Sequence, residues 1–146
     1  MQRGVSVSSQ GDIKPPRNTV TVYEKPRTRL RDHEIACIAH LEMNGIYPVV
    51  LAEDPKAPAN IDLMIDGQLW EMKNVTNNRS SIKNQFKRSR EKWRKLGLLG
   101  NPHIVMTTEG AAVPVESIVD SVLERIREGE VVMIISSDGV ICRVGK

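Results

Sequence analysis

The sequence predicts an α/β fold, a three-layer-like sandwich of helices around a central mixed sheet. Three observations predict it. The 146 residues match the usual size of one domain, strand-like apolar segments alternate with helix-like amphipathic ones, and Asp66-Gly67 between two apolar runs predicts a tight hairpin. Charged residues at 27% and hydrophobic ones at 40% are an ordinary globular balance. No apolar run approaches the length of a membrane span, so we expect a soluble chain.

Residues 1–29 differ in composition from the rest. They are rich in Ser, Gly, Pro and Thr, and they contain no apolar run typical of a secretory signal peptide. We expect them to form a linker or flexible N-terminal tail, with one short extended piece at residues 18–24. The folded domain is expected to cover residues 30–146.

After residue 30 the patterns predict, in order, a helix, a strand, a hairpin, a helix, a strand, a helix and a closing hairpin. These elements are expected at residues 30–45, 46–54, 60–75, 80–97, 103–110, 114–129 and 131–144. Asp32 is placed to cap the first helix and Gly45 to end it, while Gly97 ends the second. The closing hairpin is expected to turn around Asp138-Gly139.

The first hairpin, NIDLMIDGQLWEMKNV, carries three charges among apolar neighbours. Pairing outward from the Asp66-Gly67 turn places Asp62 opposite Glu71. Because side chains alternate along a strand, Lys73 shares their face. The sequence therefore predicts one cluster of two carboxylates and an ammonium group.

Two readings of this cluster are open. On a solvated face, Lys73 would simply be an ion-pair partner of the two acids. Directly opposed carboxylates repel each other, however, and the apolar neighbours predict strands covered on both faces. A divalent cation with oxygen ligands relieves that repulsion, so we favour a metal site formed by Asp62 and Glu71, with Mg²⁺ first and Mn²⁺ or Zn²⁺ as alternatives.

Glu34 is a candidate third carboxylate. It stands three, four and seven residues before Cys37, Ile38 and Leu41, so it projects from the apolar stripe of the first helix. We expect it to complete the metal's ligands if the stripe faces the sheet. At the edge of the stripe, it would instead lie in solvent.

The chain has a net charge of +3, and its basic residues are concentrated on the second predicted helix. One side is apolar and the other is basic, with Glu91 the single acid between residues 79 and 95. A phosphate-contacting surface is the favoured reading over a merely solvated face. The residues expected to contact substrate are Ser81, Lys83, Lys87, Arg88 and Arg90. Gln85, at the border of the apolar stripe, is expected to reach the substrate or a metal-bound water.

Two carboxylates and a lysine at this spacing suit phosphodiester hydrolysis. The acids hold a divalent ion, and the lysine positions water or stabilises developing negative charge. The pattern Asp62, then Glu71-Met72-Lys73, resembles the PD-(D/E)xK nuclease superfamily over residues 31–103. The proline that usually precedes the first acid is absent, since Ala-Asn-Ile stands there. The resemblance implies a PD-(D/E)xK nuclease-like core in which Glu34, Asp62, Glu71, Lys73 and Gln85 are catalytic.

Within that superfamily the chain resembles the C-terminal toxin domains of contact-dependent growth inhibition (CDI) proteins, many of which cleave tRNA. The matching residues are His33-Glu34, Asp62, Trp70 to Lys73 and Ser81-Ile82. A glutamine that is often found later in the second helix is replaced, with Lys92 near its place. The resemblance implies export as part of a larger protein, activity in the cytoplasm of a target cell, and a cognate immunity protein.

Three functions stay open. A metal-dependent endonuclease acting on RNA, with tRNA as the favoured substrate, comes first. A DNA endonuclease of the repair, restriction or junction-resolving type is the second, and a non-catalytic nucleic-acid-binding module the third. Aromatic residues are only 3% of the chain, and Trp70, Phe86 and Trp93 are expected in the core. Recognition should therefore depend on backbone and shape rather than on stacked bases.

The two cysteines, Cys37 and Cys142, lie far apart in apolar surroundings. They are too few for a disulfide framework, so we expect both to be free buried thiols.

Overall fold

The computed structural model describes residues 4–6, 21–23, 30–76 and 79–146, with side chains described from residue 30 and not for residues 79–80. Gly4–Ser6 (β1) and Thr21–Tyr23 (β2) form a two-stranded antiparallel sheet. β2 lies within the extended piece expected at residues 18–24. The rest of residues 1–29 lies outside the described residues, and their assignment as a tail stays a prediction.

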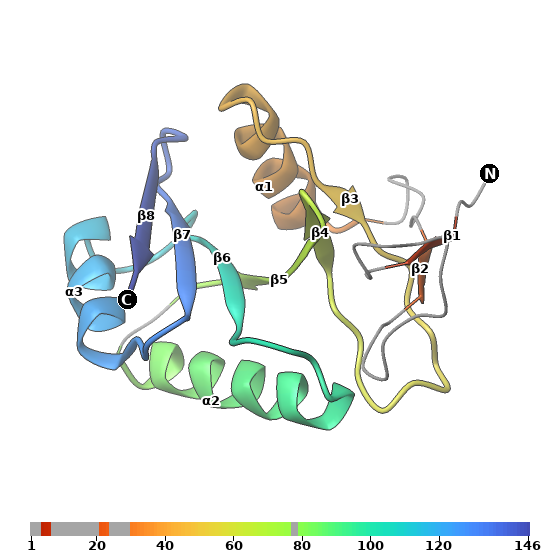
Figure 1. Cartoon of the computed structure of the whole chain (residues 1–146). Coiled ribbons are helices and arrows are strands. Elements are labelled where there is room, and N and C mark those ends of the chain that lie inside the picture. Colours follow the sequence, from red (N-terminus) through yellow and green to blue (C-terminus); the bar gives the residue numbers. More distant parts are fainter. Residues whose placement is uncertain (1–3, 7–20, 24–29, 77–78) are drawn as a thin grey trace.

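The main sheet has six strands in the order β3-β4-β5-β6-β7-β8 (Figure 1). The strands are β3 (Val49–Val50), β4 (Leu63–Ile65), β5 (Gln68–Asn74), β6 (His103–Thr107), β7 (Val131–Ile135) and β8 (Ile141–Gly145). β5, β6 and β7 are parallel to one another, and the other neighbours are antiparallel. The sheet is therefore mixed, as expected.

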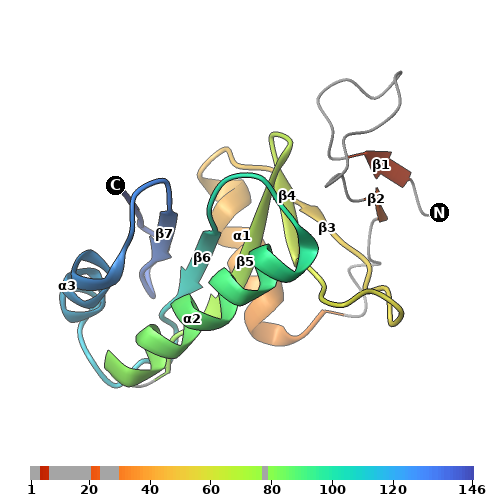
Figure 2. The ribbon, with the colours of Figure 1, turned by 60° about the horizontal axis from the view of Figure 1, so that its bottom comes forward.

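Helices cover both faces of this sheet (Figures 1 and 2). They are α1 (Asp32–Met43), α2 (Arg79–Leu96) and α3 (Val115–Arg125). The core that α1 shares with Trp70 and Val105 is distinct from the core of Phe86, Ile104 and Ile118, to which α2 and α3 contribute. α1 thus covers one face and α2 and α3 the other, which confirms the predicted three-layer α/β fold.

The first two helices end next to glycines, as the sequence predicts. Gly45 has a φ of 77° just after α1, and Gly97 a φ of 63° just after α2; glycine adopts this left-handed conformation without steric cost. The expected cap at Asp32 is displaced by one residue. Asp32 is the first helical residue, and Arg31 is the cap, with its N–H bonded to Glu34 Oε1 at 2.9 Å.

The β4–β5 hairpin forms in the predicted register. Ile65 pairs with Gln68, Met64 with Leu69, and Leu63 with Trp70. Asp66 and Gly67 both have positive φ, 50° and 79°, as a type I′ turn requires. The final strand pair, β7 and β8, also turns through Asp138-Gly139, with Ile135 paired to Ile141.

The prediction for the cysteines was half right. Both are free, and Cys37 is buried, but Cys142 is exposed. Cys142 lies on the same face of β8, the last strand of the sheet, as the buried Val144, but it lines an open cavity beside α3 with Val119 and is not covered. Among the described residues, no helix is long and apolar enough to cross a membrane.

Candidate active site

β5 presents alternate side chains to the two helical layers. Trp70 packs in the core that includes residues of α1, whereas Val75 packs against Phe86 and Ile82 of α2. Because side chains alternate along a strand, Glu71 and Lys73 fall on the α2 face with Val75. The charged pair therefore lies between the sheet and α2.

Glu71 is fully buried, with 0% of its surface exposed. Its Oε2 accepts from Lys92 Nζ of α2 at 2.7 Å and lies 3.4 Å from Lys73 Nζ. The two lysine side chains keep 25% and 23% exposure, so solvent reaches the cluster from the lysine side. Two ammonium groups compensate the buried carboxylate, which would otherwise be very unfavourable.

Asp62 lies immediately before β4. Ladder pairing stops at Leu63–Trp70, one step short of the expected Asp62–Glu71 pair. Asp62 instead reaches β5 through its side chain, whose Oδ2 accepts the N–H of Met72 at 2.8 Å. Burial and then the neighbouring charge of Glu71 raise the pKa of Asp62 to about 6. The hydrogen bond from the Met72 N–H and the positive charges of Lys92 and Lys73 lower the pKa and so oppose this rise. The structure therefore brings Asp62, Glu71 and Lys73 together, with Lys92 as a fourth member.

Lys92 was missed as a site residue by sequence reasoning. It stands seven residues after Gln85, with Ser89 between them, so the three side chains follow one line along α2. Two signals were available: this spacing from Gln85, and the place of Lys92 near the glutamine that the resembled toxin domains often carry. Both signals were obscured because Lys92 sits in a run of basic residues that resembles a solvated face.

Buried oxygen atoms on β5 and α2 lack a hydrogen-bond partner in the described part of the chain, namely Glu71 Oε1, Gln85 Oε1 and Ser89 Oγ. Gln85 is 9% exposed, and its Nε2 makes only a long contact, 3.4 Å, to the carbonyl of Asn74. Buried oxygens without partners are uncommon in native proteins. Carboxylate, amide and hydroxyl oxygens are also the donor set that Mg²⁺ or Mn²⁺ prefers, so Asp62, Glu71 and these neighbours fit a hard divalent cation.

Glu34 does not join this group. Among the described residues, no three His, Cys, Asp or Glu side chains lie close enough together to hold a metal. α1 covers the opposite face from α2, and Glu34 Oε1 is bonded to the Arg31 N–H. Burial and then the charges of Asp62 and Glu34 raise the pKa of Cys37 to about 12, so this thiol lies near both acids. Its ligand role stays a prediction that no contact in this structure supports.

The predicted substrate-binding residues fall on two flanks of α2. The spacing of four and three residues aligns Ser81, Gln85, Arg88, Lys92 and Lys95 along the flank that faces the cluster. Ser81 is half-buried there and Arg88 is exposed. The same spacing aligns Lys83, Lys87, Arg90 and Arg94 on the other flank. Only one flank is therefore adjacent to the carboxylates.

Arg90 is held in a structural pair. Its guanidinium bonds Glu130 at 2.7 and 2.9 Å and the carbonyl of Arg125 at 2.8 Å. It also lies 4.9 Å from the ring centre of Phe86. These contacts occupy the guanidinium of Arg90. Its contact with substrate stays a prediction, and the proposed function does not depend on it.

Comparisons with known proteins bear on the fold. No protein-family model matches the chain, and no curated protein matches it. One chain of a solved structure, described as "CdiA-CT/CdiI toxin and immunity complex from Burkholderia pseudomallei", aligns with a TM-score of 0.59 and 17% sequence identity. The alignment covers 84% of this chain and 94% of that one. At this identity the likeness shows a shared fold.

Proposed function

We propose that this chain is a metal-dependent endonuclease that hydrolyses phosphodiester bonds of RNA, with tRNA as its favoured substrate. One observation supports this most strongly. Two carboxylates, Asp62 and the fully buried Glu71, lie with Lys73 and Lys92 at one spot beside a helix whose outer face is basic. A buried acid with a perturbed pKa beside a second acid and a cationic surface is typical of a catalytic site for an anionic substrate.

Asp62 and Glu71 would hold the divalent cation. When bound, such a cation lowers the pKa of a coordinated water and neutralises charge on the scissile phosphate. Lys73 Nζ, 3.4 Å from Glu71, is placed to orient the attacking water or to stabilise the developing negative charge. Lys92 neutralises Glu71 and so keeps the two acids together on the folded chain.

The toxin role is part of the same proposal. It is supported by the fold shared with a chain from a CDI toxin and immunity complex and by the residues at His33-Glu34, Asp62, Trp70–Lys73 and Ser81-Ile82. In this role the domain would be exported on a larger protein and act in the cytoplasm of a target cell. A cognate immunity protein would restrain it in the producing cell.

The test is cleavage of total tRNA beside plasmid DNA, each with Mg²⁺ and with excess chelator. We expect tRNA fragments with Mg²⁺ and none with chelator. Asp62→Asn and Lys73→Met should each lower the rate at least a hundredfold while leaving the circular dichroism spectrum unchanged. Arg31→Gln, an exposed change away from the cluster, serves as the active control.

The outcomes separate the candidate functions. Cleavage of plasmid DNA but not of tRNA would replace the RNase assignment by the DNA endonuclease. Tight binding without cleavage, unaffected by chelator, would replace both by the binding module. Cleavage that survives both substitutions would contradict the assignment of the site.

A further inference from the structure

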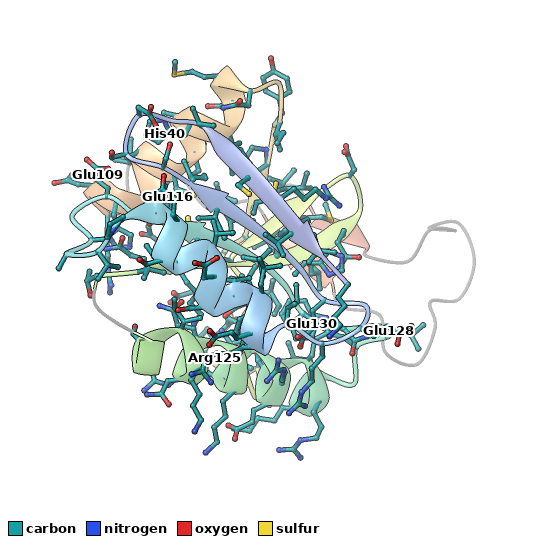
Figure 3. All side chains as sticks on the ribbon, turned by 90° about the vertical axis from the view of Figure 1, so that its left-hand side faces the viewer. His40, Glu109, Glu116, Arg125, Glu128 and Glu130 are labelled. Atoms are coloured by element: carbon teal, nitrogen blue, oxygen red, sulfur yellow. The ribbon has the colours of Figure 1, made fainter. Side chains whose placement is uncertain are left out.

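A concave site lies on the flank of α2 opposite the carboxylate cluster. It is a cavity of about 250 Å³ between the C-terminal half of α2, the loop that follows it and the loop before β7. Its wall includes Arg90, Trp93, Arg94, Leu98, Arg127 and Glu130. Figure 3 shows Arg125 at the end of α3 and Glu130 in the loop that follows it, on the side toward α2.

Glu130, the acid in the wall of this cavity, already has its hydrogen-bond partners within the chain. Glu130 is 2% exposed and accepts two hydrogen bonds from Arg90, at 2.7 and 2.9 Å, and one from the N–H of Arg127 at 2.7 Å. Arg90 also bonds the carbonyl of Arg125. This network fixes the loop before β7 against α2, so the wall of the cavity is pre-organised.

Two arginines of the wall remain without an acidic partner. Arg94 and Arg127 are exposed, and no ion pair joins either side chain to an acid in the described part of the chain. Three arginines and one glutamate line the cavity, which gives it a net charge of +2. The acids nearest in sequence, Glu91 and Glu128, are exposed and do not line it.

We propose that this cavity binds a backbone phosphate of a nucleic acid. Guanidinium groups match phosphate geometry and form two parallel hydrogen bonds with it. The volume admits a phosphate with its sugar, and Trp93, Leu98 and Pro102 supply the apolar part of the wall. The assignment of the anion to a nucleic acid rests on the proposed nuclease function, while the anion site itself does not.

The location indicates how such a substrate would lie. The cavity and the carboxylate cluster are on opposite flanks of α2. The diameter of the helix, roughly 10 Å, separates them. Exposed basic residues cover the outer face between them, namely Lys83, Lys87, Arg88, Arg94 and Lys95. A folded strand or duplex would cross over α2, with one phosphate held at the arginine cavity and the scissile one near Glu71.

The first test asks whether the cavity binds phosphate at all. Amide chemical shifts of the isotopically labelled full chain are followed while inorganic phosphate replaces chloride at constant ionic strength. We expect saturable shifts at Asn101, Arg127 and Gly129 that disappear in Arg94→Gln/Arg127→Gln. Shifts that persist in that variant, or the absence of saturation in the wild type, would overturn the proposal.

The second test asks whether the ligand is a nucleic acid. Binding of total tRNA is measured in an Asp62→Asn background, with and without the two arginine changes, at several salt concentrations. We expect about tenfold weaker binding and a salt slope smaller by about one, which corresponds to the loss of one phosphate contact. Arg31→Gln/Lys56→Gln, which removes two exposed charges elsewhere, should weaken binding less than twofold.

The two hypotheses fail separately. If the chain cleaves no nucleic acid but the phosphate and tRNA results hold, the cavity stands and the nuclease assignment falls. If the arginine changes leave tRNA binding equal to the control variant while cleavage persists, the nuclease assignment stands and the cavity is not a substrate site.

Discussion

Asp62 carries an energetic cost in the folded chain. Burial and Glu71 raise its pKa from 3.8 to about 6, so the folded state holds the proton more tightly than the unfolded state. The free energy of unfolding therefore falls as pH rises from about 3.8 to 6, and above 6 the full cost is present. A buried charge that lowers the free energy of unfolding in this way is expected where function requires it.

Asp62→Asn should consequently stabilise the protein at pH 7.5. We expect the free energy of unfolding to rise by roughly 1–3 kcal/mol, given about 1.4 kcal/mol per pKa unit, and to change little at pH 4. Asparagine can still accept the Met72 N–H. Urea denaturation at the two pH values measures the effect.

The matched control is Asp66→Asn, an exposed turn residue, which should change stability by less than about 0.5 kcal/mol at either pH. Destabilisation of Asp62→Asn at pH 7.5 would mean that the lysines more than compensate the carboxylate. In that case the cluster would be an ordinary structural ion-pair network.

Lys92 competes with a metal ion for Glu71. Its Nζ lies 2.7 Å from Glu71 Oε2, so a divalent cation must share a carboxylate that an ammonium group already neutralises. Lys92→Met should therefore tighten Mn²⁺ binding about tenfold, because a repulsive positive charge is removed from the site. Calorimetric titration with Mn²⁺ provides the measurement.

Lys95→Met is the comparison variant, one turn along the same flank but exposed, and should change Mn²⁺ affinity less than twofold. An unchanged or weaker affinity in Lys92→Met would exclude Glu71 from the metal ligands.

At the scale of elements, the Arg90–Glu130 pair joins α2 to the loop after α3. Arg90→Met would leave the carboxylate of Glu130, 2% exposed, without its cation. We expect a loss of roughly 2–4 kcal/mol in the free energy of unfolding, since removal of one partner strands a buried charge. Thermal and urea unfolding would measure it.

Two further variants isolate the cause. Arg94→Met, one turn on and exposed, should cost less than about 0.5 kcal/mol. Adding Glu130→Gln to Arg90→Met should restore more than half of the loss, because the amide oxygen still accepts the Arg127 N–H without a charge. No recovery would mean that the loss comes from packing against Phe86 rather than from the stranded charge.

The same elements explain what the sequence could predict. The β4–β5 register followed from Asp66-Gly67 because the turn and both strands are local. Helix ends at Gly45 and Gly97 followed from backbone chemistry. The partner of Arg90 could not be predicted, because Glu130 is forty residues away and only the packing of α3 brings it to α2.

For the candidate site, the sequence predicted the cluster but not its surroundings. Asp62, Glu71 and Lys73 meet because strand alternation dictates a shared face. Whether Glu34 could join them depended on which face α1 covers, and α1 covers the face away from α2. Whether Lys92 could reach Glu71 depended on the angle at which α2 packs on the sheet. Both are tertiary relations that periodicity does not contain.

At the scale of the whole molecule, charge and aromatic content together define recognition. Trp70, Phe86 and Trp93 are all 3% exposed or less, so these three offer no stacking platform, and the exposed Tyr47 follows α1 on the face of the sheet away from α2. Among residues 81–96, whose side chains are described, five exposed basic residues lie on the outer side of α2. The logarithm of the binding constant for tRNA should therefore fall with the logarithm of salt concentration, with a slope of about −4. Filter binding of tRNA to the Asp62→Asn variant measures this slope. Salt concentrations from about 50 to 200 mM cover the range in which phosphate contacts weaken.

Base composition should matter little in the same assay. Unstructured oligonucleotides of different sequence but equal length are expected to bind within about threefold of one another, since recognition through phosphates is sequence-independent. A slope near zero, or strong preference for one base, would indicate recognition through base edges.

The short Asp66-Gly67 turn also has a consequence for the order of assembly. Hairpins close within about 1–10 μs, whereas the parallel neighbours β5 and β6 meet only after α2 has crossed between them. The two acids are thus expected to approach each other before Lys92 arrives. Early in folding the nascent hairpin carries an unrelieved repulsion, and arrival of the helix relieves it. Docking of α2 should for that reason be the step of folding most sensitive to ionic strength.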